Sequence, residues 1–341
     1  MTQQRVLVTG GSGFIAGHVI LQLLDAGYLV RATLRSLDKE PAVRATLAEA
    51  GATRLDALTF TEADLLADAG WAEAMDAVDF VMHVASPVLP GHVANEDDVI
   101  VPAVSGTRRV LEAARDAGVA RVVLTSAFHA VGYGYRPTDR VFTDDDWAVL
   151  DGPGITAYSK AKVLAEQTAW EIAADSGLEL TTILPVAVMG PVMGHEVSGS
   201  NHIIQHMLAG GMPGTPDVYI PIVDVRDVAR AHLLAMTTPD AAGQRFLVTN
   251  GRTMPLAEVA ATLREHLGAA AAKVPTRRIP SFVVRLAALF NPEFRAARYD
   301  LGFARQVSAA KAQRMLGWTG RPPEESIVAA GESLVAKGLV G

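Results

Sequence analysis

The stretch RVLVTGGSGFIAGH, residues 5–18, decides the fold of this chain. An apolar, β-branched run enters a glycine-dense turn, and from Phe14 to Leu24 the apolar residues recur at helical spacing, so the stretch predicts strand, tight turn and helix. Gly10 would let the chain turn out of the strand, and Gly13 would let the backbone approach a pyrophosphate. The start of the helix would offer free N–H groups and a partial positive charge to that anion. The stretch therefore predicts a nucleotide-binding turn.

The end of the next predicted strand, residues 29–34, bears on the choice of nucleotide. In a dinucleotide-binding fold this strand end reaches the adenosine ribose, where an acidic residue accepts from the 2′-hydroxyl and a basic residue meets a 2′-phosphate. The first charged residue here is Arg35, whose guanidinium can hold a phosphate by two parallel hydrogen bonds. Arg35 and Lys39 therefore favour NADP(H) over NAD(H). A merely solvated loop is the alternative, and Asp38 leaves NAD(H) open.

Composition and charge exclude several classes of protein. Of the 341 residues, 50% are hydrophobic and 20% are charged, which is a globular balance in a chain long enough for one large domain and a smaller lobe. The net charge of −7, without a run of Lys or Arg, argues against nucleic acid or an anionic membrane as partner. The absence of cysteine excludes disulfides and thiolate metal sites, and we expect no metal. With no signal-peptide pattern and no run of about 18 apolar residues, we expect a cytoplasmic protein that binds a small molecule.

Strand and helix patterns alternate along most of the chain. Further apolar runs predict strands at residues 58–60, 78–87, 121–127, 178–185 and 245–249. This alternation predicts an α/β fold, with a Rossmann-type doubly wound parallel sheet covered by helices on both faces. Ligands in such folds bind beyond the carboxyl ends of the strands. His83, a lone histidine in an apolar run, is expected to be a packed core residue.

The domain division follows from the same patterns. Residues 1–185 and 221–250 are expected to form the NADP(H)-binding Rossmann domain, and residues 186–220 and 251–341 a smaller mixed substrate-binding lobe. Residues 186–220, rich in Gly, Met and Pro, are typical of a flexible substrate lid. The charges of residues 223–231 are interpreted as a structural salt-bridged turn and helix N-cap.

A second motif, in the helical segment 156–166, carries the chemistry. Tyr158 and Lys162 are four residues apart and lie on one helix face. A phenol with a pKa near ~10 is a poor base at neutral pH, but an adjacent ammonium would lower that pKa. Tyr158 would then act as general acid toward a carbonyl oxygen, and as base in the reverse direction. Alone, the pair also fits a half-exposed helix face.

The chain resembles the extended short-chain dehydrogenase/reductase family in three features. These are the glycine spacing of residues 9–16, the Tyr158/Lys162 pair, and the strand between them that ends in hydroxyl side chains. Residues 145–147, 157–160, 164–166 and 183–185 are similar to its branch of dihydroflavonol reductases and NADPH-dependent aldehyde/ketone reductases. The resemblance implies NADP(H) contacts at Thr9, Gly10, Ser12, Gly13, Phe14, Ile15, Arg35, Lys39, Asp64, Leu65, Val84, Ala85, Ser86, Thr125, Tyr158, Lys162, Pro185 and Val186.

The resemblance also assigns roles within this set. Asp64 and Leu65 would border the adenine, although Asp64 could equally be a helix N-cap. Lys162 would bind the nicotinamide-ribose hydroxyls, and the Pro185 region would flank the nicotinamide. Helices near 100–117 and 157–174 pair between subunits in some relatives, whereas many relatives in this branch are monomers, so a monomer or a homodimer is expected.

The chain departs from the resembled family at one position. Family members usually read Thr-Ser-Ser at the end of the fifth strand, and the last serine donates a hydrogen bond to the substrate carbonyl; here the triplet is Thr125-Ser126-Ala127. Ser126 is our candidate for the missing donor, while Thr125, His129 or a water molecule are alternatives. Loss of one such donor typically costs ~10²–10³ in rate.

These observations predict an NADPH-dependent carbonyl reductase acting reversibly on aldehydes or ketones, with catalytic residues Tyr158, Lys162 and Ser126. A nucleotide-sugar epimerase or dehydratase is a second hypothesis, disfavoured because no acidic residue directly ends the second strand. A non-catalytic NADP(H)-binding sensor is a third, which Ala127 keeps open.

Overall fold

A seven-stranded sheet forms the centre of the molecule, in the order β12-β7-β5-β4-β1-β2-β3. The computed structural model describes residues 3–87, 93, 95–290 and 298–340. Every strand pairing in this sheet is parallel. Its strands are β1 (Arg5–Val8), β2 (Leu29–Leu34), β3 (Leu58–Glu62), β4 (Phe80–His83), β5 (Arg121–Thr125), β7 (Glu179–Pro185) and β12 (Arg245–Val248).

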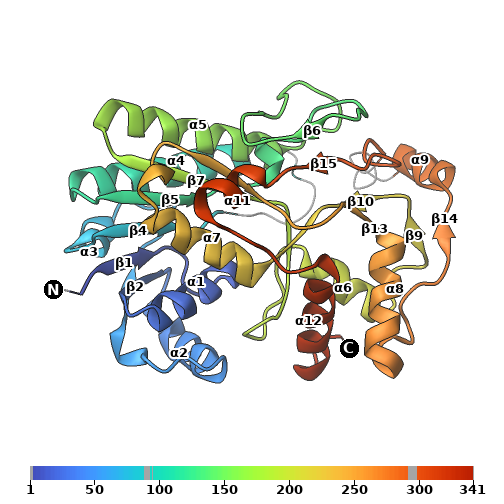
Figure 1. The fold of residues 1–341 in the computed structure, drawn as a ribbon, viewed down its shortest axis with the longest axis horizontal. Coiled ribbons are helices and arrows are strands. Elements are labelled where there is room, and N and C mark those ends of the chain that lie inside the picture. Colours follow the sequence, from blue (N-terminus) through green and yellow to red (C-terminus); the bar gives the residue numbers. More distant parts are fainter. Residues whose placement is uncertain (1–2, 88–92, 94, 291–297, 341) are drawn as a thin grey trace.

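Helices cover the sheet on both faces (Figure 1). Strand β1 shows why, because Val6 and Val8 belong to one hydrophobic cluster and Leu7 to another. The first cluster contains residues of α1 (Phe14–Asp25), α2 (Glu40–Glu49) and α7 (Val225–Thr237), and the second residues of α3 (Trp71–Met75), α4 (Asp97–Asp116) and α5 (Ala157–Ser176). Since side chains alternate along a strand, a strand that is apolar at successive positions must be buried on both sides. The predicted Rossmann-type doubly wound sheet is confirmed.

A smaller lobe carries its own hydrophobic core, with Met207 of α6, Leu263 of α8 and Leu334 of α12 fully buried in it. Its helices are α6 (Asn201–Leu208), α8 (Leu256–Leu267), α9 (Ser281–Phe290) and α12 (Pro323–Ala336). Short strands pair as β8 (Ala187–Met189) with β11 (Ile222–Asp224), β9 (Thr215–Pro216) with β14 (Arg278–Ile279), β10 (Tyr219–Ile220) with β13 (Met254–Pro255), and β6 (Val141–Phe142) with β15 (Gln306–Val307). Only the β10–β13 pair among these is antiparallel, so the pairing is mixed.

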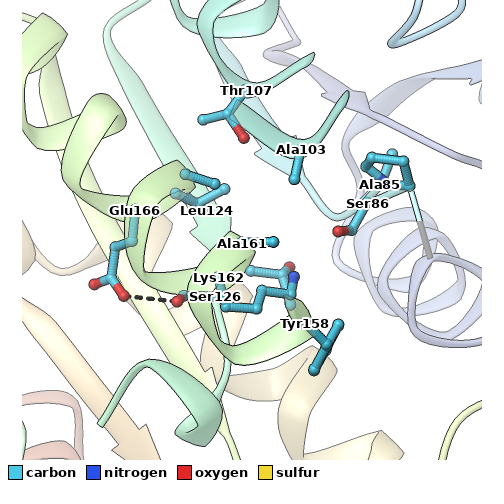
Figure 2. Close-up of a pocket in the computed structure, with 13 residues that line it drawn as sticks. Ala85, Ser86, Ala103, Thr107, Leu124, Ser126, Tyr158, Ala161, Lys162 and Glu166 are labelled. Carbon is cyan, nitrogen blue, oxygen red and sulfur yellow. Dashed lines mark hydrogen bonds between the residues drawn. The ribbon is translucent and has the colours of Figure 1, made fainter. Parts of the chain in front are cut away.

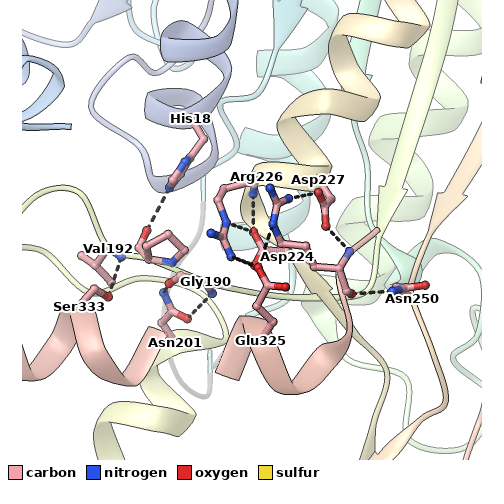
Figure 3. Close-up of polar contacts among 12 residues, drawn as sticks. His18, Gly190, Val192, Asn201, Asp224, Arg226, Asp227, Asn250, Glu325 and Ser333 are labelled. Carbon is pink, nitrogen blue, oxygen red and sulfur yellow. Dashed lines mark hydrogen bonds and ion pairs between the residues drawn. The ribbon is translucent and has the colours of Figure 1, made fainter. Parts of the chain in front are cut away.

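Polar contacts join the lobe to the sheet domain (Figure 3). Asp224 caps α7, accepting from the Arg226 N–H at 2.8 Å, and pairs with the Arg226 guanidinium at 2.7 Å. Arg226 in turn reaches Glu325 of α12 at 3.5 Å, and Asp227 pairs with Arg321. The interpretation of residues 223–231 as a salt-bridged turn and helix N-cap is confirmed.

One segment lies on the other side of the predicted domain boundary. Helix α11 (Ala310–Leu316) and Trp318 pack into the hydrophobic cluster of the sheet domain, and the indole N–H of Trp318 donates to the Asp227 carbonyl at 2.9 Å. The rest of the division stays a prediction. Among the helices that the structure describes, none combines the length and apolarity that a bilayer crossing needs.

Candidate active site

The loop between β1 and α1 is held by its neighbours in the sheet. The Gly10 N–H donates to the Thr33 hydroxyl at 3.0 Å, and the Gly11 N–H donates to the Thr33 carbonyl at 2.8 Å. Gly10 has φ of +69°, and a Cβ at this position would lie 3.0 Å from Cβ of Ala85. Both the backbone conformation and the close approach of the loop after β4 therefore require glycine.

Thr9 ties the end of β1 to the loop after β4. Its buried hydroxyl accepts from the N–H groups of Val84 at 3.0 Å and Ala85 at 2.9 Å, which leaves its own hydrogen for Nδ1 of His83 at 2.9 Å. His83 is 1% exposed, as expected for a core histidine, and burial lowers its pKa to about 3. The Thr9 side chain thus positions Val84 and Ala85, two of the predicted cofactor contacts.

The N-terminus of α1 is built to receive an anion. Its N-cap, Gly13, has no side chain to offer, and the first turn contains no acidic residue. The N–H groups of Phe14, Ile15 and Ala16 consequently have no partner within the helix. Ser12 and Gly13 are exposed, so a ligand can reach this turn. The cradle fits a pyrophosphate, as the glycine spacing predicts.

Two cations stand at the end of β2. Arg35 and Lys39 are both exposed, and neither forms a hydrogen bond or ion pair with any residue that the structure describes. The Ser36 hydroxyl accepts from the Asp38 N–H at 3.3 Å and so caps the short 3₁₀ helix Leu37–Lys39, which contains Asp38. Arg35 and Lys39 are therefore free for the 2′-phosphate contact predicted for them.

The neighbouring strand ends carry the remaining predicted contacts. The Asp64 carboxylate accepts from the Leu66 N–H at 3.0 Å, and α3 starts only at Trp71, so the alternative of Asp64 as a helix N-cap is wrong. Leu65 follows β3, with its carbonyl accepting from Arg109 of α4 at 2.9 Å. Pro185 ends β7, and both Pro185 and Val186 are buried at the carboxyl edge of the sheet.

Tyr158 and Lys162 occupy the first turns of α5. The hydroxyl of Thr156 caps this helix by accepting from the Ser159 N–H at 3.2 Å, which fixes where the helix begins. Both side chains are half-buried, and Nζ of Lys162 lies 5.9 Å from the centroid of the Tyr158 ring. They line one pocket together with Ala85 and Ser86 from the loop after β4 (Figure 2). The two sequence motifs, far apart in the chain, therefore meet at one edge of the sheet.

Burial dominates the ionisation of this pair. Burial raises the pKa of Tyr158 to about 12, because the phenolate loses hydration. Burial also lowers the pKa of Lys162 to about 8, although the carboxylate of Glu166 acts in the opposite direction and raises it. The expectation that the ammonium lowers the pKa of Tyr158 is wrong for this structure. At neutral pH the phenol keeps its proton, which is the state that a general acid needs.

The hydroxyls at the end of β5 are already committed. Ser126 donates to the Glu166 carboxylate at 2.6 Å (Figure 2), and Thr125 lies 2.7 Å from Nε2 of His232. The His232 Nδ1–H donates to the Val228 carbonyl at 2.8 Å, so Nε2 accepts from Thr125. Ser126 lines the same pocket as Tyr158, but its hydrogen points to Glu166; its role as carbonyl donor stays a prediction.

Further groups around Tyr158 come from distant parts of the chain, and sequence reasoning named only His129 among them, as an alternative donor. His129, in the 3₁₀ turn Phe128–Ala130, stacks on Tyr133 with the ring centroids 4.2 Å apart and contacts Tyr158 edge-on. Arg305, more than 170 residues further along the chain than Tyr133, lies 4.5 Å from the Tyr133 centroid. No local pattern links residues so distant in sequence. Glu166, four residues after Lys162, could have been found from helical spacing.

Comparisons with known proteins identify the family of this chain. A model of the NAD dependent epimerase/dehydratase family matches residues 6–249. The chain belongs to this family. Membership confirms the resemblance to extended short-chain dehydrogenases/reductases, because the matched range contains both the glycine turn and the Tyr158/Lys162 pair.

Several proteins similar to this chain are reductases by name. Cinnamoyl-CoA reductase 1 of Oryza sativa subsp. japonica is 38% identical over 266 residues, covering 77% of this chain and 76% of that protein. Ketoreductase azaE of Aspergillus niger is 34% identical over 270 residues, covering 73% and 78%. The yeast methylglyoxal/isovaleraldehyde reductase Gre2, solved in complex with NADPH, shares the fold with a TM-score of 0.79 at 24% identity, covering 98% of this chain and 99% of that one.

Proposed function

We propose that this protein is an NADPH-dependent carbonyl reductase acting on aldehydes or ketones. The observation that carries the proposal is the meeting of Tyr158 and Lys162 with Ala85 and Ser86 in one pocket at the carboxyl edge of the sheet. This edge is where ligands of doubly wound folds bind. This arrangement supports the proposal, because a protonated phenol lies beside the loops that we propose to bind the cofactor.

The residues present fit NADP(H). The uncapped N-terminus of α1 and the glycine turn would hold the pyrophosphate, and Arg35 with Lys39 would hold the 2′-phosphate. Asp64, Leu65 and the loop Val84–Ser86 would border the adenosine and ribose, while Pro185 and Val186 would flank the nicotinamide. NADPH, when bound, supplies a hydride to the carbonyl carbon. A related fold, that of the yeast reductase named above, was solved with NADPH.

The chain's own residues supply the proton. The Tyr158 O–H donates to the carbonyl oxygen as charge develops there, and its raised pKa of about 12 keeps it protonated until that moment. Lys162, with its pKa of about 8, is mostly an ammonium at neutral pH; it lies close enough to stabilise the phenolate left behind and to orient the ribose hydroxyls. In alcohol oxidation the proton moves the opposite way.

The substrate class is defined by its carbonyl group. The relatives named above are a cinnamoyl-CoA reductase, a ketoreductase and a methylglyoxal/isovaleraldehyde reductase, and a carbonyl is what these substrates have in common. We further propose that residues 186–220, together with the lobe part of 251–341, form the substrate pocket, and that the enzyme works in the cytoplasm as a monomer or a homodimer.

The test is cofactor oxidation by the purified full-length protein. NADPH absorbance is followed with a panel of aryl and alkyl aldehydes, ketones and diketones, and in parallel with nucleotide-sugar substrates. We expect oxidation of NADPH with at least one simple carbonyl and formation of the matching alcohol. Conversion of a nucleotide sugar without net cofactor turnover would instead identify an epimerase, and NADPH binding without any turnover would identify a sensor.

A further inference from the structure

The end of β5 has no free hydroxyl to offer a substrate. Ser126 gives its hydrogen to Glu166 at 2.6 Å, Thr125 gives its hydrogen to His232, and Ala127 has no hydroxyl at all. The carboxylate of Glu166 also accepts from Thr182 at 2.9 Å and from Arg245 at 2.8 Å. Turning Ser126 outward would therefore break a buried network, which is costly.

His129 is a polar side chain packed against the ring of Tyr158. The ring centroids of His129 and Tyr158 are 4.9 Å apart, with an interplanar angle of 76°. His129 is half-buried, and no hydrogen bond joins either of its ring nitrogens to a residue that the structure describes. The imidazole N–H, beside the Tyr158 ring, is therefore not committed to another residue that the structure describes.

Contacts with Tyr133 fix the imidazole ring. Tyr133 stacks on it at an interplanar angle of 10°. Arg305 holds Tyr133 in turn. It lies 4.5 Å from the Tyr133 centroid, pairs with Asp300 at 2.8 Å and donates to the Gly132 carbonyl at 2.9 Å. The segment that carries Arg305 thus holds a side chain of the sheet domain in place. A donor fixed in this way needs no reorganisation when charge develops.

The environment keeps the ring neutral. Burial, with the positive charges of Arg305 and Lys162, lowers the pKa of His129 to about 3. A neutral imidazole carries one N–H and one lone pair, so it can donate one hydrogen bond without competing with Tyr158 as the source of the proton.

We propose that His129 donates a hydrogen bond to the substrate carbonyl oxygen, next to Tyr158, and thereby supplies the polarising contact that Ala127 cannot make. The inference rests on the proposed carbonyl reduction. Tyr133 and Arg305 act through His129 as positioning residues.

The experiment separates the N–H of His129 from its packing. His129→Phe keeps an aromatic ring against Tyr158 and Tyr133 but removes the donor; Ala127→Ser, alone and combined with His129→Phe, adds a hydroxyl at the end of β5. For each variant, kcat and KM are measured with a carbonyl that the unsubstituted protein reduces, and the Kd for NADPH is measured by fluorescence. Ser126→Ala is measured beside them as the competing donor.

We expect His129→Phe to lower kcat by about 10²–10³-fold, the usual cost of one such donor, with the Kd for NADPH unchanged. In the combined variant the added serine should recover at least about tenfold of that loss, because it offers the carbonyl a new donor. Three results would overturn the proposal. His129→Phe could keep a kcat within about threefold of the unsubstituted protein, or Ala127→Ser could fail to restore kcat in the combined variant. The third is a loss of about 10²–10³-fold in Ser126→Ala instead of His129→Phe. Absence of carbonyl turnover by the unsubstituted protein would overturn the proposed function with it, whereas an active protein with an unaffected His129→Phe variant overturns this inference alone.

Discussion

Ser126 donates a hydrogen bond of 2.6 Å to the carboxylate of Glu166, a side chain fully buried on α5. The same carboxylate pairs with Arg245 of β12 at 2.8 Å, so one charge joins α5 to the edge strand of the sheet. The Ser126 hydroxyl, our candidate donor to the substrate carbonyl, therefore belongs to a buried polar network that joins α5 to the sheet.

Removing the Glu166 carboxylate should destabilise the protein strongly. Glu166→Ala leaves the guanidinium of Arg245 buried and unpaired, so we expect the free energy of unfolding to fall by about 3–5 kcal/mol in urea titrations. Glu166→Gln, which keeps hydrogen-bonding atoms in place, should lose less. Glu171→Ala, an exposed position on the same helix, is the control and should change stability by no more than about 0.5 kcal/mol. Equal effects at both positions would contradict the role of the buried pair.

The glycine turn offers a matched pair of substitutions. Gly10 and Gly118 have nearly the same φ, +69° and +68°, but a Cβ would approach Ala85 at the first position and meet nothing within 4 Å at the second. Both alanine variants should lose about 1–2 kcal/mol of stability from backbone strain. Only Gly10→Ala should also weaken NADPH binding, by at least about tenfold, because its added methyl displaces the loop after β4. Equal NADPH affinity in both variants would show that this close approach does not shape the cofactor site.

Arg35 should determine the preference between the two nicotinamide cofactors. Arg35→Ala would remove the proposed bidentate contact with the 2′-phosphate. Such a contact is worth about 1.5–3 kcal/mol, so we expect KM for NADPH to rise by about 10- to 100-fold while KM for NADH changes little. Arg278→Ala, an exposed arginine on β14 at the far end of the lobe (Figure 1), is the control. A parallel loss with both cofactors would mean that Arg35 does not read the 2′-phosphate.

The rate of carbonyl reduction should fall in alkaline solution. The pKa of Lys162 is about 8, below its ordinary value, so its ammonium prevails below that pH and is lost above it. The Tyr158 phenol, with a pKa of about 12, stays protonated through the same range. Burial lowers the pKa values of the nearby His83 and His129 to about 3, so neither titrates there.

The measurement is kcat from about pH 6 to about pH 10, where reduction should decline by up to about tenfold per pH unit above the break near pH 8. In Lys162→Arg, whose charge does not titrate in this range, the break should disappear even if the rate is lower. A flat profile in the unsubstituted protein, or the same break in the arginine variant, would exclude Lys162 as its source.

Features encoded by local patterns could be predicted from the sequence. The turn at Gly10, the seven strands of the main sheet and the helix that carries Tyr158 and Lys162 each follow from a repeating apolar pattern or a glycine stop. Helix α2 (Glu40–Glu49) was missed because only Val43 and Leu47 are buried, which is too few for a clear period. The two-residue strands of the lobe have no readable period at all.

Features that depend on burial or distant contacts could not be predicted. The pKa of Tyr158 is raised because the surrounding residues exclude water from its hydroxyl. The spacing of residues in the sequence does not show how deeply a side chain is buried. The support of His129 by Arg305 joins a loop of the sheet domain to a segment near the end of the chain. Ser126 was a reasonable candidate from its place after β5, but its hydrogen bond with Glu166 depends on how α5 packs on the sheet.

The role of Tyr158 as the proton donor is tested most directly by one substitution. Tyr158→Phe keeps the ring that contacts His129 and removes only the hydroxyl. With NADPH and a carbonyl that the unsubstituted protein reduces, we predict a loss of at least about 10²-fold in kcat with an unchanged Kd for NADPH. Turnover equal to that of the unsubstituted protein would contradict the account, because the proton on the carbonyl oxygen would then come from a group other than Tyr158.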